Sequence, residues 1–427
     1  MAANAPSPFI ALQHRNFRLL WTGQLISFSG SSMQTAAILW HVALLVQPER
    51  RPMALGMVGL VRLMPIVLFA IAGGTIADAS DRRRVMFYTQ ATMCVTAGAL
   101  AWLTHAGMNH PWPIYGLAAV SAAANAFDSP ARQSLMPTLV PREQLANAIS
   151  LNAIMLQVAS VAGPAIGGLI IAILGVKWVY ALNAVTFIGV IVALLMMRDV
   201  PPRGAGEAGD ISVRAIRDGL GFVFSSPIIR ATMLLDFFAT FFSSATALLP
   251  IFAQDVLRVG ARGYGWLYAA PSLGAVLTSL VMVRSIERIE RRGVVLIWAV
   301  SVYGLATVMF GLSRSFWLTF LCLAATGAAD TVSMVLRNVI RQLGTPDHLR
   351  GRMVGINMVF VQGGPQLGEL EAGAVGQLFG PRASVVTGGV GCLIATGWIA
   401  ARTPKLRRYC RTSIDASERG RLRSVVR

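Results

Sequence analysis

The chain has 427 residues, of which 55% are hydrophobic and only 13% are charged, and its mean hydropathy is +0.61. This composition excludes a soluble globular protein of similar length and indicates an integral membrane protein. The formal net charge of +18 could indicate a nucleic-acid partner, so the positions of the basic residues must be considered first.

Apolar stretches of about 20 residues, each long enough to cross a hydrocarbon core of about 30 Å, recur along almost the whole chain. The first of them, Phe17 to Val46, is too long for a cleavable signal peptide, so we expect the N-terminus to be retained. The predicted membrane spans are residues 17–46, 53–77, 85–105, 112–132, 148–174, 178–197, 229–254, 263–284, 294–312, 316–338, 353–379 and 382–402. The sequence therefore predicts an all-α protein with twelve transmembrane helices.

Basic residues are distributed unequally between the two sides of these spans. About 29 Lys and Arg fall on the side that holds the N-terminus, the 199–228 loop and the C-terminal tail, and about 7 fall on the other side. The positive-inside rule then places both termini in the cytoplasm of a multi-pass inner-membrane protein. Most of the basic charge encodes topology, with weak attraction to the headgroups of the lipid bilayer, and no nucleic-acid partner is expected.

The second half of the chain repeats the first at an offset of about 205 residues. The matching pairs are Arg132 and Arg337, Pro141 and Pro346, Asn152 and Asn357, Gly163 and Gly368, Gly168 and Gly373, Gly175 and Gly380, and Lys177 and Arg382. The predicted domains are an N-terminal six-helix bundle at 1–198, a cytoplasmic linker at 199–228, a C-terminal six-helix bundle at 229–403 and a basic cytoplasmic tail at 404–427. Two pseudo-symmetric bundles of this kind surround a central pathway.

The stretch GGTIADASDRRRV, residues 73–85, follows the second span. A charged, tight turn is typical of any short cytoplasmic loop, but the spacing here resembles the loop motif of the major facilitator superfamily, G-x-x-x-D-[RK]-x-G-[RK]-[RK]. Ala79 and Asp81 depart from that motif. The matching residues are Gly74, Asp78, Arg82 and Arg83. The resemblance implies that they form a cytoplasmic gate, which holds the two halves together by charge attraction.

The fifth span contains SVAGPAIGGLI, which can be interpreted in two ways. Small residues let neighbouring helices approach closely, so the glycines could serve packing alone. The pattern G-P-x-x-G-G also resembles the antiporter motif of exporters in the superfamily, although Ser150 and Ala159 replace its upstream glycines. The motif residues are Gly163, Pro164, Gly167 and Gly168. This resemblance favours export over import.

Residues 127–152, FDSPARQSLMPTLVPREQLANAISLN, carry a more specific resemblance. Together with NFRLLWTGQLIS near the N-terminus and GINMVFVQGGPQLGELEAG near the C-terminus, they resemble the bacterial branch of the superfamily that contains the enterobactin exporter. The resemblance covers essentially the whole chain and implies a proton-driven exporter of siderophores or lipophilic drugs. The arginine expected midway along the fourth span of drug exporters is missing, so proton coupling must rest on other residues.

Two carboxylates, Glu369 and Glu371, lie in the eleventh span. An ionised Glu near a helix centre costs about 2.5–3.5 kcal/mol by insertion scales, so it is expected to face protein or water rather than lipid. Helical spacing places Gln362 and Gln366 on the same stripe as Glu369, and places Glu371 on another face. We therefore expect Glu369 to couple protons at the central pathway and Glu371 to lie at a flanking contact.

Arg62 is the basic residue placed well inside a predicted span, at a depth that matches that of Glu369. In the superfamily's fold the second and eleventh spans pack against each other. We hypothesise that Arg62 pairs with Glu369, or with Glu371, to close the periplasmic side, and that protonating the acid weakens this gate. A static ion pair without a role in coupling is the alternative.

Further polar residues extend the candidate site. Asp236 and Asp330 lie within apolar runs and are candidates for proton or cargo binding, with a local hydrogen bond to a neighbouring helix as the alternative. The candidates for the substrate cavity are Gln34, His41, Asn125, Asp128, Gln362 and Gln366. A lone His in a span is more often a packing residue than a titrating one.

These observations favour an exporter that works by alternating access, is powered by proton entry and carries a small amphipathic molecule. The absence of a GxxxxGK[ST] phosphate loop argues against ATP as the energy source. A proton-coupled importer of a small metabolite and a non-transporting membrane scaffold or sensor are the alternatives, although a scaffold has little reason to keep intramembrane acids. We expect a monomer that is not an enzyme, with no metal and no cofactor.

Overall fold

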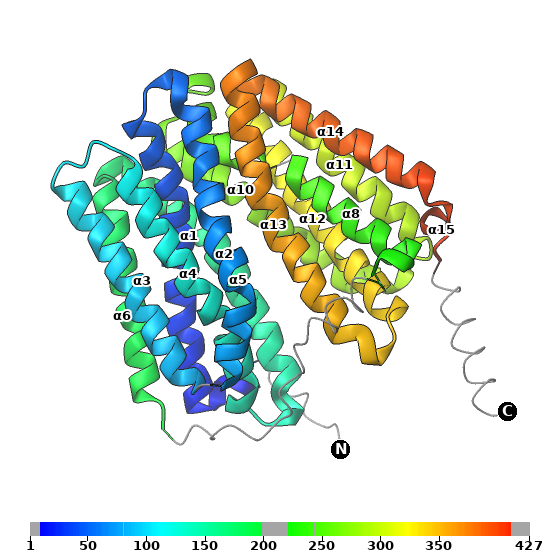
Figure 1. Cartoon of the computed structure of the whole chain (residues 1–427), viewed down its shortest axis with the longest axis horizontal. Helices are drawn as coiled ribbons and strands as arrows, with labels where there is room; N and C mark the ends of the chain where they lie inside the picture. Colours follow the sequence, from blue (N-terminus) through cyan, green and yellow to red (C-terminus); the bar gives the residue numbers. More distant parts are fainter. Residues whose placement is uncertain (1–8, 80, 199–220, 222, 243, 411–427) are drawn as a thin grey trace. The chain divides into compact units, whose positions relative to one another are not determined.

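The structure is a computed structural model that describes residues 9–79, 81–198, 221, 223–242 and 244–410. All regular secondary structure among these residues is helical (Figure 1). Most of the predicted linker at 199–228 and the predicted tail beyond residue 410 lie outside the described residues. The expectation of an all-α chain is confirmed for the described part.

The chain divides into two compact units. The first holds the residues up to 208 together with Ala253–Ala269, and the second holds 209–252 and the residues from 270 onward. The helices of the first are α1 (Arg15–Leu45), α2 (Arg51–Ala79), α3 (Arg82–His105), α4 (Trp112–Leu135), α5 (Leu145–Ile173) and α6 (Val176–Met196). The helices of the second are α8 (Pro227–Phe242), α9 (Leu249–Ile251), α11 (Arg292–Leu312), α12 (Phe316–Gly344), α13 (Asp347–Phe379), α14 (Pro381–Arg402) and α15 (Pro404–Arg407).

Helix α10 (Gly260–Ser285) begins in the first unit and continues into the second. The segment Ala253–Ala269 comes from the second half of the sequence, yet it belongs to the first unit. Sequence reasoning placed this segment in the C-terminal bundle, because span assignment follows chain order. The four predicted domain ranges stay a prediction.

Eight helical stretches of the described chain are long and apolar enough to cross a membrane. They are Pro48–Phe69, Arg142–Ile173, Val176–Met196, Pro227–Val256, Gly260–Val283, Arg292–Leu312, Phe316–Gly344 and Pro381–Arg402. The other predicted spans fall on α1, α3, α4 and α13, which are not among these eight stretches. The number of twelve spans therefore stays a prediction.

Within each unit, the helices pack in the same set of pairs. In the first unit α1 packs on α5 and α6, and α3 packs on α4 and α6. In the second unit α8 packs on α13 and α14, and α11 packs on α12 and α14. Because the same pairs recur in the same chain order, this packing supports the internal repeat predicted at the 205-residue offset.

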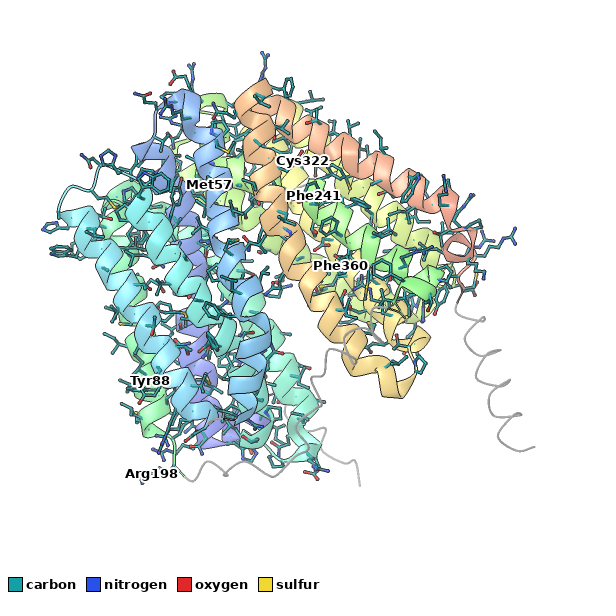
Figure 2. All side chains as sticks on the ribbon, viewed as in Figure 1. Met57, Tyr88, Arg198, Phe241, Cys322 and Phe360 are labelled. Carbon is teal, nitrogen blue, oxygen red and sulfur yellow. The ribbon has the colours of Figure 1, made fainter. Side chains whose placement is uncertain are left out.

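Large apolar side chains are exposed on several helices, among them Tyr88, Val95 and Trp102 on α3, of which Figure 2 labels Tyr88. On α11, Trp298, Leu305 and Leu312 are exposed at seven-residue spacing and therefore form one stripe. A soluble monomer rarely exposes apolar surface of this extent. These faces have the chemistry of lipid-contacting surface.

Candidate functional site

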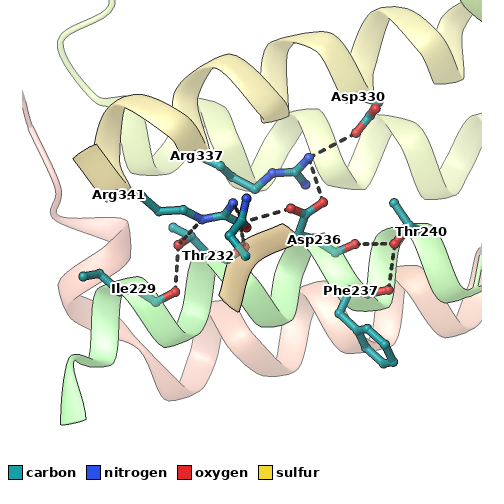
Figure 3. A network of polar contacts seen from close by, with 9 residues as sticks. Ile229, Thr232, Asp236, Phe237, Thr240, Asp330, Arg337 and Arg341 are labelled. Atoms are coloured by element: carbon teal, nitrogen blue, oxygen red, sulfur yellow. Dashed lines mark hydrogen bonds and ion pairs between the residues drawn. The ribbon is translucent and has the colours of Figure 1, made fainter. Parts of the chain in front are cut away.

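Four charged side chains of the second unit form one network (Figure 3), and three of them, Asp236, Arg337 and Arg341, are buried. Asp236 of α8 pairs with two arginines of α12: its Oδ1 lies 3.0 Å from Arg337 Nη2 and its Oδ2 lies 3.1 Å from Arg341 Nη2. The same Nη2 of Arg337 lies 3.2 Å from Oδ1 of Asp330. Each charge therefore has a partner of opposite sign.

Helical spacing places these residues on facing stripes. Asp330, Arg337 and Arg341 stand seven and four residues apart on α12, so they share one face of that helix. Thr232 and Asp236 share one face of α8, and Arg341 donates to the backbone oxygen of Thr232 at 2.9 Å and to its hydroxyl at 3.2 Å. Residue spacing along each helix places the side chains on one face. The packing of α8 against α12 then brings the two faces together.

Arg341 also connects a third helix to the network. Its Nη1 donates a hydrogen bond to Oδ1 of Asn357 on α13. Asn357 is one of the residues matched by the internal repeat, but sequence reasoning gave it no role. A single guanidinium thus links α12, α8 and α13.

The two acids of the network differ in environment. Asp236 is 5% exposed and each of its oxygens pairs with a different arginine. The Asp330 side chain is 43% exposed and pairs only with Arg337 among the described residues. Breaking a buried ion pair typically costs about 3–5 kcal/mol, whereas a solvent-exposed pair contributes about 0–1 kcal/mol. Asp330 can therefore lose its charge at a lower cost than Asp236.

The arginines of this network were not among the predicted site residues. Helix α12 continues to Gly344, six residues beyond the predicted end of the tenth span, so Arg341 lies inside the helix and is buried. Arg337 was visible only as the repeat partner of Arg132. That match, two arginines at corresponding positions near the ends of apolar spans, was the available signal.

A second buried charge lies in the first unit. Asp128 of α4 accepts hydrogen bonds from the Thr89 hydroxyl at 2.8 Å and the Gln90 amide at 3.0 Å, both on α3. Arg132, one turn further along α4, lies 3.7 Å from Asp128, and its guanidinium stacks over the Phe28 ring of α1. Arg132 and its repeat partner thus both pair with a buried aspartate, although the aspartates come from different positions.

The other cavity candidates of the first unit lie apart from Asp128. Gln34 is buried and accepts a hydrogen bond from Asn183 of α6 at 2.8 Å. His41 is buried with Nδ1 3.2 Å from the Tyr180 hydroxyl, also on α6. Asn125 is exposed. The structure therefore places Gln34 and His41 between α1 and α6, in contacts typical of helix packing, and does not bring the four candidates together.

The glycines of the G-P-x-x-G-G motif lie where helices nearly touch. A Cβ added at Gly163 would lie 2.5 Å from the Ser29 carbonyl oxygen of α1, and one added at Gly167 would lie 2.6 Å from Met33 Cγ. A Cβ at Gly168 would lie 2.6 Å from the Cα of Gly265 at the start of α10. The motif therefore serves close packing on both α1 and α10.

The segment Ala253–Ala269 makes three further contacts within the first unit. The Tyr264 hydroxyl donates to the Ala36 carbonyl oxygen at 2.8 Å, and the Tyr264 ring lies 5.1 Å from that of Trp40. Asp255 pairs with Arg51 at 3.2 Å. This segment is therefore attached by polar contacts as well as by the Gly168–Gly265 crossing.

The predicted cytoplasmic gate is described only in part. Gly74 and Asp78 lie in α2, but their side-chain environments fall outside the described residues. Arg82 donates to the Ser134 carbonyl oxygen at 2.9 Å and Arg83 donates to that of Leu195 at 3.2 Å, at the C-terminal ends of α4 and α6. Both guanidinium groups thus donate to carbonyl oxygens at the negative ends of helix dipoles. Their role in a gate stays a prediction.

The predicted periplasmic gate joins residues of separate units. Arg62 is half-buried in the first unit, within electrostatic range of Tyr180. Glu369 and Glu371 are half-buried on α13 of the second unit. The ion pair between Arg62 and either acid stays a prediction. On the same helix Gln366 is half-buried and Gln362 is exposed, so their role at the cavity stays a prediction as well.

Repeated helix packing and helices of membrane-crossing length are features of the major facilitator fold. The profile of a family described as transmembrane secretion effector matches residues 6–421, and the chain belongs to this family of the superfamily. It is thus a multi-pass membrane protein and a transporter rather than an enzyme.

Two curated relatives illustrate the similarity. The enterobactin exporter EntS of Shigella boydii serotype 18 is 28% identical over 404 residues, which cover 93% of this chain and 94% of that protein. The enterobactin exporter EntS of Escherichia coli O6:K15:H31 is 28% identical over 412 residues, covering 95% and 96%. The resemblance to this branch is confirmed.

Solved structures show the same fold at low sequence identity. A bacterial homologue of the human lysosomal transporter Spinster has a TM-score of 0.71 at 16% identity and covers 93% of this chain and 98% of its own. The nucleoside transporter NupG has a TM-score of 0.70 at 13% identity and covers 92% of this chain and 99% of its own. These similarities support the fold alone.

Proposed function

We propose that this protein is a proton-driven exporter of the inner membrane that carries a small amphipathic molecule, such as a siderophore or drug, outward by alternating access. The proposal includes twelve spans in two six-helix bundles, cytoplasmic termini and a monomeric state. Support comes from relatives named as exporters, from the G-P-x-x-G-G motif and from the ionisable groups buried in the second unit. The observation that carries it is the network of Asp236, Asp330, Arg337 and Arg341.

Within this proposal Asp330 is the proton-carrying acid. Protonating Asp236 would leave two buried arginines without their shared counter-charge, because its oxygens serve both Arg337 and Arg341. Protonating Asp330 leaves Arg337 paired with Asp236. An acid that gains and loses a proton in every cycle has to be one whose neutral form the protein tolerates, and Asp330 meets this condition.

Further residues complete the proposed cycle. Glu369 and Glu371 are additional proton-coupling candidates, since both are half-buried on α13. Arg62 with Glu369 would close the periplasmic side, and Gly74, Asp78, Arg82 and Arg83 would close the cytoplasmic side. The contact of Arg341 with Asn357 gives the Asp330 network a direct connection to α13.

Transport in inside-out membrane vesicles tests this proposal, with enterobactin as the test cargo. An imposed gradient that acidifies the vesicle interior is expected to drive enterobactin uptake, and a protonophore is expected to abolish it. Asp330→Asn is expected to abolish the dependence on the gradient. The matched control is Glu143→Gln, at an exposed acid in the short 3-10 helix Arg142–Gln144, and it is expected to behave as the native chain. Glu369→Gln tests the second acid in the same way.

Two results would count against this assignment. Gradient-driven uptake that is equal in the native chain and in Asp330→Asn would remove Asp330 from coupling. Uptake that ignores the pH gradient in the native chain, and is driven instead by ATP or by the cargo gradient alone, would remove the proton as the energy source.

A further inference from the structure

We propose that Asp330 and Arg337 together form a cargo-binding edge for an uncharged group that carries a hydrogen-bond donor next to an acceptor, such as a hydroxamic acid or a primary amide. This inference rests on the proposed function, because it names the class of cargo that the Asp330 network recognises.

Arg337 has more hydrogen-bond donors than its partners use. A guanidinium carries five N–H donors, but both aspartates of the network contact the same nitrogen, Nη2. Nε and Nη1 are buried and have no hydrogen-bond partner among the described residues, and the whole side chain is 3% exposed. Buried donors in proteins are nearly always satisfied, so these two nitrogens indicate an acceptor supplied from elsewhere.

One carboxylate oxygen of Asp330, Oδ2, is an unused hydrogen-bond acceptor. Its Oδ1 serves Arg337, and no described residue hydrogen-bonds to its Oδ2. Because the side chain is 43% exposed on a membrane-length helix, and an ionised carboxylate is unfavourable against hydrocarbon, the open oxygen is expected to face water or cargo. Asp330 and Arg337, which are joined by an ion pair in Figure 3, therefore offer one unused acceptor and two unused donors.

The charge balance of the network selects an uncharged ligand group. Asp236 and Asp330 carry two negative charges and Arg337 and Arg341 carry two positive ones, so the network is neutral. An anion at Arg337 would lie beside both aspartates, and a cation at Asp330 would lie beside Arg337. A neutral group that donates to Asp330 and accepts from Arg337 satisfies both side chains without adding a buried charge.

The same geometry makes proton and cargo exclude each other. A protonated Asp330 holds a hydrogen where the donor of the cargo needs a lone pair, so the protonated edge cannot make both hydrogen bonds. Among the described residues, the titratable groups that interact electrostatically with Asp330 are Arg337 on α12, Asp236 on α8 and the Tyr303 phenol on α11. Mutual exclusion of proton and cargo is the condition that an antiporter requires.

Binding of three small aromatic probes to the purified full chain in detergent tests the inference without any gradient. Benzohydroxamic acid carries a donor beside an acceptor and is neutral at pH 7, benzoate carries acceptors only, and benzylammonium carries donors only. Isothermal titration calorimetry at pH 7 is expected to show at least tenfold tighter binding of benzohydroxamic acid than of the two ions. The binding is expected to weaken at least tenfold in Asp330→Asn, where an amide N–H₂ replaces the open acceptor.

Two variants keep the test independent of folding defects. Arg337→Lys keeps the charge but loses the planar set of donors, so it is expected to weaken benzohydroxamic acid at least fivefold while preserving the fold, checked by the size-exclusion profile. Glu143→Gln, an exposed acid outside the network, is expected to bind as the native chain.

Three outcomes would overturn the inference. These are no measurable binding of benzohydroxamic acid by the native chain, equal binding in all variants, and stronger network-dependent binding of benzoate or benzylammonium. The proposed function fails separately: probe binding that follows this pattern alongside enterobactin transport that ignores the pH gradient would refute proton-driven export and leave the binding edge intact.

Discussion

The Tyr264 hydroxyl donates a hydrogen bond to the Ala36 backbone oxygen at 2.8 Å, although the two residues stand 228 positions apart in the chain. Ala36 lies in α1, and Tyr264 lies in the segment of the second sequence half that belongs to the first unit. A hydroxyl donor on a fully buried ring thus ties α10 to α1.

Tyr264→Phe is expected to lower the free energy of unfolding by about 0.5–1.5 kcal/mol, because the ring is kept and one hydrogen bond is lost. Tyr88→Phe provides the control, since Tyr88 is 68% exposed on α3, and its effect is expected to stay within about 0.5 kcal/mol. Reversible unfolding in mixed micelles measures both. Equal effects of the two substitutions would show that the Tyr264 contact adds nothing to stability.

The crossing of α5 and α10 at Gly168 and Gly265 leads to a second prediction. A Cβ at Gly168 would lie 2.6 Å from the Gly265 Cα and 2.7 Å from the Ala261 carbonyl oxygen, both in backbone that has little room to shift. Gly168→Ala is therefore expected to destabilise the chain by about 1–3 kcal/mol through overpacking.

The matched control for this glycine is Gly189→Ala on α6, where an added Cβ meets nothing within 4 Å. In that exposed helix interior the substitution is expected to be neutral or to stabilise by up to about 1 kcal/mol. Thermal unfolding of the two variants in the same detergent compares them. A Gly168→Ala chain as stable as Gly189→Ala would contradict the close approach of the two helices.

The two acids of the charged network are expected to separate stability from transport. Asp236→Asn is expected to cost about 3–5 kcal/mol of unfolding free energy, because both oxygens serve buried arginines. Asp330→Asn is expected to cost about 0–1 kcal/mol, because its single ion pair is half-exposed. Unfolding in mixed micelles and gradient-driven uptake, measured on the same preparations, test the separation. The opposite order of stabilities would refute the distinction between a fixed and an exchangeable acid.

Tyr409 follows α15 and lies outside the spans, and its phenol is expected to make the free energy of unfolding depend on pH. Its carbonyl oxygen accepts a hydrogen bond from Gly293 N–H at the start of α11, and burial raises the pKa of its phenol, an effect that nearby Arg292 partly offsets. Because its pKa is raised in the folded state, the neutral Tyr409 phenol contributes to stability. This contribution is complete below about pH 10, the usual pKa of Tyr, and declines as the pH rises through the folded pKa.

Removing the phenol hydroxyl tests this sign. Between about pH 9 and 11 the unfolding free energy of the native chain is expected to fall more steeply than that of Tyr409→Phe, and the two profiles are expected to run in parallel below about pH 9. Parallel profiles across the whole range would show that the Tyr409 phenol does not contribute to the alkaline loss of stability.

The sequence by itself determined that this is a membrane protein, that its elements are helices and that its halves repeat. Hydrophobicity adds up along the chain and helical periodicity acts over a few neighbouring residues, so both can be read from local sequence. The same reasoning placed Asp236 and Asp330 inside apolar runs, where an acid is costly enough to require a partner.

Only the tertiary structure decided which partner each polar residue has. It joined Asp236 to both Arg337 and Arg341, turned Gln34 and His41 toward α6, and placed Gly265 against Gly168. These contacts join positions that are far apart in the chain, and they depend on how whole helix faces pack, which no local pattern encodes. For that reason the sequence predicted which residues carry the chemistry, and the fold determined which of them act together.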